Sequence, residues 1–488
     1  MSKSIEPTKP APAAAARAPG AASIRFGTDG WRGVIAEDFT FENVRLAARA
    51  IARYLLANED PSKGLIVGYD CRFLSDRFAR AAAEEVAANG IFVRLGLSFA
   101  PTPAVAFAVR TLGAAGAIVI TASHNPWQWN GLKFKASYGG SADPEIIRKI
   151  EAELGPAAAS RGPLREASRV EKCDPVEPYL RHIEAVVDMR EIARSGMRFV
   201  VDPIYGAARG CLKTICARHR IPCEEIHGEA NPLFGGLNPE PIEPHVAELR
   251  QAVRNSRADA GFATDGDADR VGAIDRTGRF IDSHQIFAIL LRYLVEARGM
   301  RGGVVKTFST TKLVDHLANK HSLPLYETPI GFKYICDHML SKQILIGGEE
   351  SGGIGIPALG GPERDGVLNS MLLAEAMAFY GKSLEELVEE LHREFGPFYY
   401  GRADLELRAG QKERAIAAAS APELKQFAGF EVLRRENLDG IKMYLANGAW
   451  LLVRASGTEP LLRVYTEASS EEIVQQVLAE AERVIRKM

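Results

Sequence analysis

The stretch Ala117–Pro126 reads AIVITASHNP, in which the apolar run AIVIT leads directly into the polar loop ASHNP that contains Ser123. Its β-branched and apolar residues predict a short buried strand. Further strands are expected at 65–69 and 91–95, with an Ala-rich amphipathic helix at 76–89 between them. This alternation predicts βαβ units, and in open α/β sheets ligands bind beyond the carboxyl ends of the strands.

Two later units repeat this arrangement. The expected strand Ala260–Thr264 ends at the loop DGDADR (265–270), and the strand Gln343–Ile346 ends at GGEESGG (347–353). After Pro397 the expected elements are strands at 401–407, 440–445, 450–453 and 463–468 and helices near 411–419 and 470–487. The predicted fold class is therefore α/β, with three α/β units followed by a smaller α+β unit.

The loop DGDADR carries carboxylates at alternate positions, Asp265, Asp267 and Asp269. Such carboxylates repel one another unless a cation neutralises them, and hard divalent ions such as Mg²⁺, Mn²⁺ or Ca²⁺ take oxygen ligands. An EF-hand is excluded, because its sixth and twelfth loop positions would be Arg270 and Arg276 in place of Gly and Glu. The alternative interpretation is an acidic turn at the end of a strand.

The other strand-end loops carry side chains suited to phosphate and sugar chemistry. Ser123 can act as a nucleophile or phosphate carrier, and a simple turn residue is the alternative. The carboxylate and hydroxyl acceptors at 347–353 suit sugar hydroxyls. A phosphate nest is indicated by one guanidinium, two hydroxyls and a glycine amide after the strand at 450–453: Arg454, Ser456, Gly457 and Thr458. A solvated polar turn is the alternative for each of these last two loops.

The composition is that of an ordinary globular protein, with 488 residues of which 46% are hydrophobic. The 60 Lys+Arg and 62 Asp+Glu give a formal net charge of −2, so neither nucleic acid nor a membrane surface is an expected partner. No apolar stretch is long enough to span a bilayer. The six cysteines include no CxxC pair, which favours free thiols and a cytoplasmic location. One group matches no structural zinc pattern and is expected to pack in the core: Cys211, Cys216, His219 and Cys223.

Residues 1–22 contain eight Ala and four Pro, so a disordered tail is predicted and a targeting peptide is disfavoured. Residues 155–175 are rich in Pro, Arg and Ser and are expected to form a linker. A helix at 143–154 is expected to end at Gly155-Pro156, and another is expected over 206–219. The expected units are residues 23–165, 176–273, 274–396 and 397–488.

Four motifs in order resemble those of the α-D-phosphohexomutase family. TASHNP (121–126) is similar to its phosphoserine loop, DGDADR to its metal loop, GEESGG (348–353) to its sugar-binding loop and RASGTEP (454–460) to its phosphate-binding loop. FGTDGWRG (26–33) also fits, and the resemblance covers residues 23–488. It implies four domains around one cleft. It also implies that a phosphoryl group moves between O1 and O6 of a hexose phosphate through a hexose 1,6-bisphosphate, which acts as intermediate and activator.

The resemblance implies roles for the phosphoserine and metal loops. Ser123 would be phosphorylated, and a phosphoserine oxygen would bind Mg²⁺ together with Asp265, Asp267 and Asp269. Lys133 matches the candidate general base, and a cationic neighbourhood and burial are expected to lower its pKa. The side chains expected to bind phosphoryl oxygens are His124, Arg32 and Arg270.

The resemblance also implies how the sugar is held. Glu349 and Ser351 match the positions that bind O3 and O4. Gly331 and Lys333 lie in PIGFK (329–333), which is similar to a loop that helps to read sugar orientation. The residues that would hold the phosphate that does not react are Arg454, Ser456, Gly457 and Thr458.

The sugar loop favours glucose. Family members that also take mannose often carry Met in place of Glu350 and His in place of Gly353, and phosphoglucosamine mutases usually carry Gln in place of Glu350. The expected activity is therefore a phosphoglucomutase, which interconverts glucose 1-phosphate and glucose 6-phosphate. A phosphomannomutase or a dual-specificity enzyme is the alternative, and a phosphatase or a non-catalytic sugar-phosphate sensor represents other classes. The intact Ser123 and Lys133 argue against a sensor.

Overall fold

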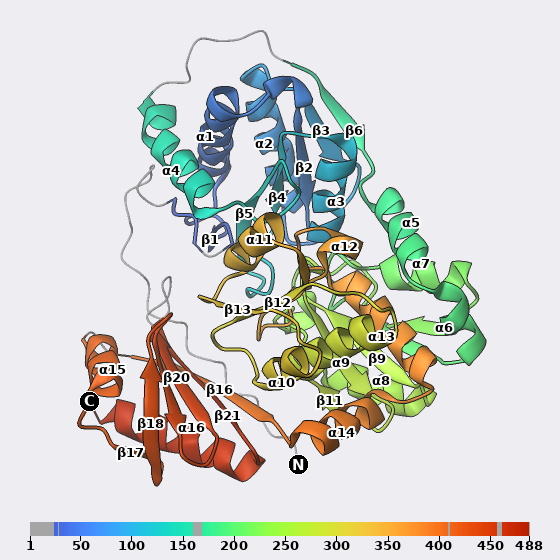
Figure 1. Cartoon of the computed structure of the whole chain (residues 1–488). Coiled ribbons are helices and arrows are strands. Elements are labelled where there is room, and N and C mark those ends of the chain that lie inside the picture. The colour runs from blue at the N-terminus through green and yellow to red at the C-terminus, as the bar shows by residue number, and fades with distance from the viewer. Residues whose placement is uncertain (1–23, 28, 160–167, 408–409, 456–460, 488) are drawn as a thin grey trace, which may run out of the picture.

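The computed structural model describes residues 24–487, apart from 28, 160–167, 408–409 and 456–460. Four sheets follow one another along the chain, and the C-terminal sheet lies to one side of the other three (Figure 1). The predicted tail at 1–22 lies outside the described residues. No helix in the described part of the chain combines the length and the apolar character needed to cross a membrane.

The first sheet has the strand order β1-β5-β4-β2-β3-β6. Its strands are β1 (Trp31–Val34), β2 (Leu65–Tyr69), β3 (Val93–Gly96), β4 (Gly116–Ile120), β5 (Trp129–Ala136) and β6 (Val170–Cys173). Its helices are α1 (Phe41–Asn58), α2 (Ser75–Ala88), α3 (Thr102–Leu112) and α4 (Pro144–Ala159), with a 3₁₀ turn at Pro61–Lys63. Helices α1, α2 and α4 pack on one face and α3 on the other, so the central strands are buried on both sides and read as apolar runs.

The second sheet has the order β11-β10-β9-β7-β8. Its strands are β7 (Phe199–Asp202), β8 (Cys223–Glu225), β9 (Ala260–Thr264), β10 (Val271–Asp275) and β11 (Phe280–Ile281). The helices are α5 (Val176–Val186), α6 (Met189–Ser195), α7 (Cys211–Arg218) and α8 (Ala247–Ser256), with a 3₁₀ turn at Phe234–Gly236. The expected boundary at 273 is wrong, because it falls inside β10, which pairs with both β9 and β11.

The third sheet has the order β13-β12-β14-β15. Its strands are β12 (Gly303–Thr307), β13 (Leu325–Thr328), β14 (Ile344–Gly348) and β15 (Ile354–Gly355). Its helices are α9 (Ser283–Glu296), α10 (Leu313–Lys320), α11 (Phe332–Ser341), α12 (Pro357–Gly360), α13 (Gly366–Tyr380) and α14 (Leu384–Phe395). The second and third units share one hydrophobic core, which holds their loops in fixed positions relative to one another.

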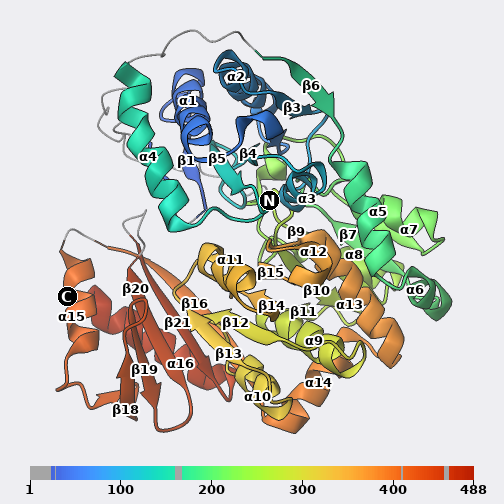
Figure 2. The same cartoon turned by 45° about the horizontal axis from the view of Figure 1, so that its top comes forward.

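The C-terminal sheet has the order β16-β21-β20-β19-β18-β17 and is antiparallel throughout. Its strands are β16 (Tyr399–Glu406), β17 (Gln426–Phe427), β18 (Phe430–Glu436), β19 (Ile441–Leu445), β20 (Trp450–Ala455) and β21 (Leu461–Ala468). Helices α15 (Gln411–Ser420) and α16 (Glu471–Arg486) cover one face (Figure 2). The predicted succession of three α/β units and a smaller α+β unit is confirmed.

Three further expected segments differ from the structure. Helix α4 continues beyond Gly155-Pro156, because Ala157 is buried and its carbonyl accepts a hydrogen bond from Arg49 Nη1 at 2.9 Å. Residues 170–173 of the expected linker form β6, which pairs with β3. The helix expected from 206 begins only at Cys211, after a turn that packs against the DGDADR loop.

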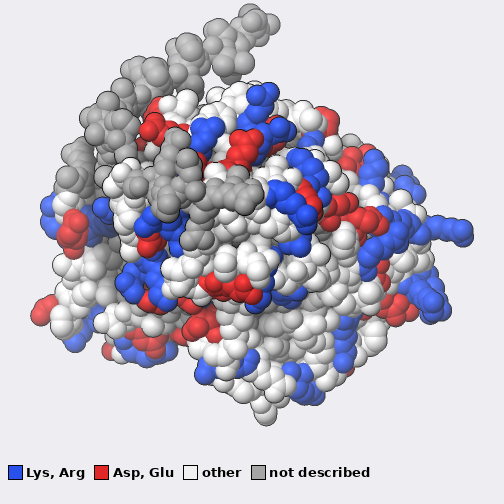
Figure 3. Space-filling model, turned by 90° about the horizontal axis from the view of Figure 1, so that it is seen from above, with Lys and Arg blue, Asp and Glu red and all other residues white. Residues whose placement is uncertain are grey.

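The surface charges and the cysteines agree with what the composition predicts. On the face seen in Figure 3, basic and acidic side chains are interspersed, in keeping with the net charge of −2. All six cysteines are described and unpaired, as predicted. Cys211 and Cys216 are buried in the shared core, and the described residues contain no zinc-like cluster.

An aromatic cluster joins the C-terminal sheet to the third unit. Phe308 from the loop after β12 packs against Tyr444 and Trp450. Lys442 on β19 is buried among these rings, and its Nζ donates a hydrogen bond to Phe308 O at 2.7 Å. Burial lowers the pKa of Lys442 to about 7.

The pKa of Lys442 predicts a pH-dependent stability. Because the folded pKa lies below the usual 10.5, the unfolded chain binds the additional proton, so the free energy of unfolding should rise with pH between about 7 and 10.5. In Lys442→Met this rise should be smaller. In the control Lys149→Met, whose side chain is 42% exposed, it should be unchanged. Thermal unfolding at about pH 7 and about pH 9 measures the difference. Identical pH dependence of the stability in wild type and Lys442→Met would contradict the lowered pKa of Lys442.

Candidate active site

The polar loops that follow β4, β9 and β14 meet at one place. Ser123 Oγ donates a hydrogen bond to Asp265 Oδ2 at 2.7 Å, although the two residues are 142 positions apart. A methyl group added at Gly266 would lie 2.4 Å from Ser123 O, so the two loops touch through their backbones. Arg364 then connects Asp269 of the second unit to Glu349 of the third. The carboxyl ends of three strands therefore form a single site.

The loop after β4 holds Ser123 in a constrained conformation. Ser123 is 1% exposed and has a φ of +52°, a left-handed value that costs on the order of 1 kcal/mol for a non-glycine residue. Its amide donates to Thr121 Oγ1 at 2.9 Å. Arg72 Nη2 donates to the carbonyls of Ser123 and Asn125, both at 2.6 Å. These bonds fix the direction in which the Ser123 hydroxyl points.

The three aspartates of the DGDADR loop are fully buried. Their ligand oxygens all lie within 4.8 Å of one another. Asp265 Oδ1 accepts the amides of Asp269 and Arg270, whereas Oδ1 of Asp267 and of Asp269 has no hydrogen-bond partner in the described part of the chain. Burial and the neighbouring carboxylates raise the pKa of Asp265 well above its usual value. Orphaned oxygens in a carboxylate cluster suit a hard divalent cation.

Lys133 on β5 lies among carboxylates. Its Nζ is 2.7 Å from Asp267 Oδ2, 3.0 Å from Asp269 Oδ2 and 2.9 Å from Asp29 Oδ2. The predicted lowering of its pKa is wrong. Burial does lower the pKa of Lys133, but the three carboxylates outweigh burial and raise it above the usual value. The neighbourhood is anionic, which favours the charged form of this lysine.

Arg364 and Asp29 are site residues that were not predicted. Arg364 Nη2 donates to Asp269 Oδ2 at 2.7 Å and also to Asp29, and Nη1 donates to Glu349 Oε2 at 3.0 Å. One guanidinium thus binds carboxylates from all three α/β units. Asp29 lies within the motif FGTDGWRG, so the sequence contains a signal for Asp29. Arg364 lies in none of the motifs.

Three predicted phosphate-binding side chains lie around Ser123. His124 Nδ1 is 3.4 Å from Ser123 Oγ. Burial and the cations of Arg270 and Arg32 hold the pKa of His124 well below its usual value, so the ring is neutral. Arg32 Nη1 donates to Asn125 Oδ1 at 2.5 Å. Arg270 is buried, with Nη1 3.6 Å from Glu240 Oε1. The structure therefore brings these three side chains together with Ser123.

The predicted sugar loop follows β14. Glu349 is 5% exposed, and burial raises the pKa of its carboxyl. Ser351 is half-buried in the same turn. The carboxylate of Glu350 points elsewhere, accepting hydrogen bonds from Ser309 Oγ at 2.7 Å and Thr307 Oγ1 at 3.1 Å. Glu349 is thus the carboxylate of this loop that reaches the Arg364 network.

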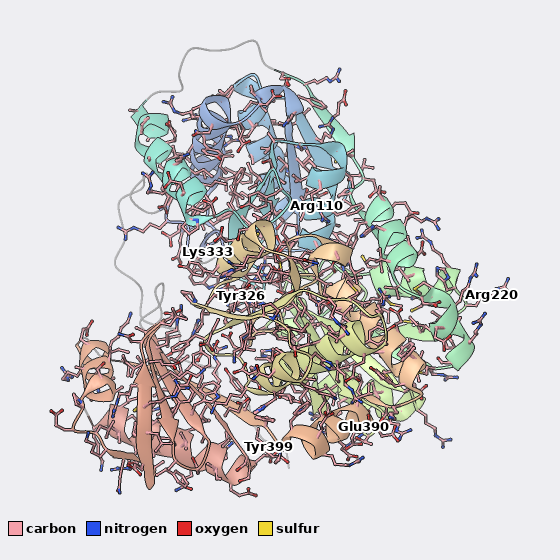
Figure 4. The ribbon with its side chains drawn as sticks, in the orientation of Figure 1. Arg110, Arg220, Tyr326, Lys333, Glu390 and Tyr399 are labelled. Carbon is pink, nitrogen blue, oxygen red and sulfur yellow. The ribbon has the colours of Figure 1, made fainter. Side chains whose placement is uncertain are left out.

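The loop at 329–333 belongs to the third unit and leads into α11. Gly331 precedes α11 with a φ of +134°, a backbone conformation that L side chains rarely adopt. Lys333 lies in the first turn of α11, at the boundary with the first unit (Figure 4). Burial lowers the pKa of Lys333, and Asp29 partly offsets that effect. The ammonium of Lys333 is therefore close to the charged network of the site.

Only part of the predicted phosphate nest lies within the residues that the structure describes. Ser456, Gly457 and Thr458 lie outside the described residues. Arg454, at the end of β20, is described, and its Nε is 3.0 Å from Asp439 Oδ2.

Four family models match the chain in order. Three describe the alpha/beta/alpha domains I, II and III of phosphoglucomutase/phosphomannomutase and match residues 23–159, 177–278 and 282–395. The fourth describes the C-terminal domain of the same proteins and matches residues 408–484.

Full-length relatives match as well. A phosphoglucomutase/phosphomannomutase of Thermococcus kodakarensis is 32% identical over 93% of this chain and 96% of its own length. A phosphoglucosamine mutase of Carboxydothermus hydrogenoformans is also 32% identical, over 95% of this chain and 99% of its own. A crystal structure of a putative phosphomannomutase from Thermus thermophilus superposes with a TM-score of 0.84 at 38% identity, and the match covers 95% of this chain and 99% of that one.

The aspartate cluster predicts magnesium binding that depends on Asp267. Asp267→Asn removes one anionic oxygen ligand and should weaken Mg²⁺ binding by about tenfold to a hundredfold. Isothermal titration with Mg²⁺ measures the affinity. Asp259→Asn is the matched control, because this carboxylate lies just before β9, at the opposite end of the strand from the cluster. Equal affinities for wild type and Asp267→Asn would contradict the metal site.

Proposed function

Because the chain belongs to the phosphoglucomutase/phosphomannomutase family, we propose that it is a phosphoglucomutase acting on glucose 1-phosphate and glucose 6-phosphate. The family resemblance of the motifs is confirmed, and the chain is a mutase enzyme of the isomerase class. In the proposed reaction a phosphoryl group passes between Ser123 and the O1 or O6 hydroxyl of the sugar, through glucose 1,6-bisphosphate.

One observation carries the proposal. The hydroxyl of Ser123 and the carboxylate of Glu349 belong to one hydrogen-bonded assembly, which runs through the aspartate cluster and Arg364. A phosphate acceptor beside a fixed sugar-binding carboxylate is what a mutase needs, because both ends of the same sugar must reach one nucleophile in turn.

The side chains around Ser123 divide the work of phosphoryl transfer. Arg32 and Arg270 would bind the phosphoryl oxygens, whose charge spreads during transfer. The neutral ring of His124, 3.4 Å from Ser123 Oγ, can share a proton with that oxygen. Lys133 would contribute positive charge and can donate a proton to a departing oxygen. The role of Lys133 as the candidate general base, which the family resemblance implies, stays a prediction.

The donor set at Asp265, Asp267 and Asp269 fits Mg²⁺, and Ser123 adjoins it. Bound there, Mg²⁺ would supply Lewis-acid stabilisation of phosphoryl charge. The chain itself holds the three carboxylates in place. Asp265 accepts two backbone amides, Asp267 accepts from Thr102 Oγ1 at 2.5 Å, and Asp269 accepts from Arg364 Nη2 at 2.7 Å.

The preference for glucose is supported by the surroundings of Gly353. A methyl group added at Gly353 would lie 2.3 Å from Arg364 Cδ, so the stem of Arg364 occupies the space that a side chain at 353 would need. A histidine, which is frequent at this position in family members that also use mannose, does not fit while Arg364 binds Glu349. The names of two relatives include phosphomannomutase and phosphoglucosamine mutase, so mannose and glucosamine phosphates are the competing candidate substrates.

Turnover with Mg²⁺ and a trace of glucose 1,6-bisphosphate tests the proposal. We expect kcat/KM for glucose 1-phosphate to exceed the values for mannose 1-phosphate and glucosamine 1-phosphate by at least about tenfold. Ser123→Ala should abolish turnover and leave the circular dichroism spectrum unchanged, whereas the exposed control Ser98→Ala should behave as wild type. Equal or better turnover of mannose or glucosamine phosphate would contradict the glucose assignment. An active Ser123→Ala would contradict the nucleophile.

A further inference from the structure

The turn between β18 and β19 lies directly against Arg454. Asp439 in this turn places Oδ2 3.0 Å from Arg454 Nε. The next residue, Gly440, has a φ of +90°, and a methyl group added there would lie 2.5 Å from Val453 O and 3.1 Å from Arg454 Cα. The turn therefore follows the backbone of β20 closely, and its carboxylate has little freedom to move away from the arginine.

The same carboxylate oxygen also reaches the third unit. Asp439 Oδ2 accepts a hydrogen bond from Ile330 N at 2.9 Å, across 109 residues of sequence. Ile330 immediately precedes Gly331 in the loop that leads into α11 and Lys333. The Asp439 side chain is 24% exposed and that of Arg454 is 14% exposed, so the contact is shielded from much of the solvent. One oxygen thus binds a cation of the C-terminal unit and a backbone amide of the third unit.

We propose that Asp439 is a positioning residue: it orients the Arg454 guanidinium for substrate phosphate and keeps that guanidinium in register with the loop at 329–333. This inference rests on the proposed function, because it takes Arg454 as a phosphate ligand. An ion pair at Nε occupies one edge of a guanidinium, and the edge formed by the two terminal nitrogens is the one that binds phosphate bidentately.

A purely structural role for Asp439 is the competing explanation. The aromatic cluster around Trp450 and the buried Lys442 already joins the two units through several side chains. Loss of Asp439 should therefore change substrate affinity more than it changes thermal stability. A structural role predicts the reverse.

Two variants separate the contacts of Asp439. Asp439→Asn keeps an oxygen that can accept from Ile330 N and removes the charge beside Arg454, and Asp439→Glu restores the charge. We expect Asp439→Asn to raise KM for glucose 1-phosphate about three- to tenfold with little change in kcat, and Asp439→Glu to recover part of that loss. Glu480→Gln is the matched control. It removes the carboxylate of an exposed ion pair with Arg483 on α16 and should leave KM unchanged.

A double-mutant cycle shows whether Asp439 acts through Arg454. If it does, adding Asp439→Asn to Arg454→Ala should change KM by less than about twofold, because the group it positions is gone. Independent, multiplying effects would overturn the proposal. So would an Asp439→Asn protein that matches Glu480→Gln in KM, or one that loses thermal stability with unchanged KM.

Failure of the proposed function can be told apart from failure of this inference. If the wild-type chain turns over none of the hexose phosphates tested, the proposed function fails. The same variants are then compared by calorimetric titration with glucose 1,6-bisphosphate. Weaker binding by Asp439→Asn, removed in the Arg454→Ala background, would still support the positioning role, and equal binding by all variants would overturn it.

Discussion

The site depends on the neutralisation of buried carboxylates by two buried cations. Asp267, Asp269 and Asp29 all contact Lys133, and Arg364 binds the last two of these and Glu349 as well. Carboxylates removed from water cost several kcal/mol each unless paired, so neither cation can be lost without leaving uncompensated charge. The carboxylates come from three separate units, and the pairing therefore holds those units in one arrangement.

This electrostatic assembly explains why the architecture is built from strands that end at the same place. Each α/β sheet delivers one loop at the carboxyl ends of its central strands, and the shared core of the second and third units fixes two of those loops relative to each other. The C-terminal sheet is attached differently, through an aromatic cluster, the oxygen of Asp439 and the hydrogen bonds that Lys312 donates to Glu467 and Gly448. Arg454, the predicted phosphate ligand of this sheet, is paired with Asp439.

The sequence predicts the strands and loops that carry the chemistry, because strands buried on both faces appear as uninterrupted apolar runs such as those at 65–69 and 260–264. It does not predict β5, whose buried Lys133 and Lys135 interrupt the apolar pattern. Their counter-charges lie far along the chain, at 134 and 136 residues for Lys133. Arg364 is likewise far in sequence from the carboxylates that it binds in the first two units, so the sequence does not mark it as a site residue. The pKa of Lys133 is raised and not lowered, because a pKa depends on neighbours that only the tertiary structure supplies.

In the proposed function, this assembly places Ser123 as a phosphate acceptor. Its most direct test is the intact mass of the purified protein after incubation with Mg²⁺ and glucose 1,6-bisphosphate, followed by peptide mapping. We expect the mass of one phosphoryl group above the mass of the unmodified chain, before or after the incubation, carried by the peptide that contains Ser123. A protein that carries no phosphoryl group before or after the incubation, or that carries it on another residue, would contradict this role of Ser123.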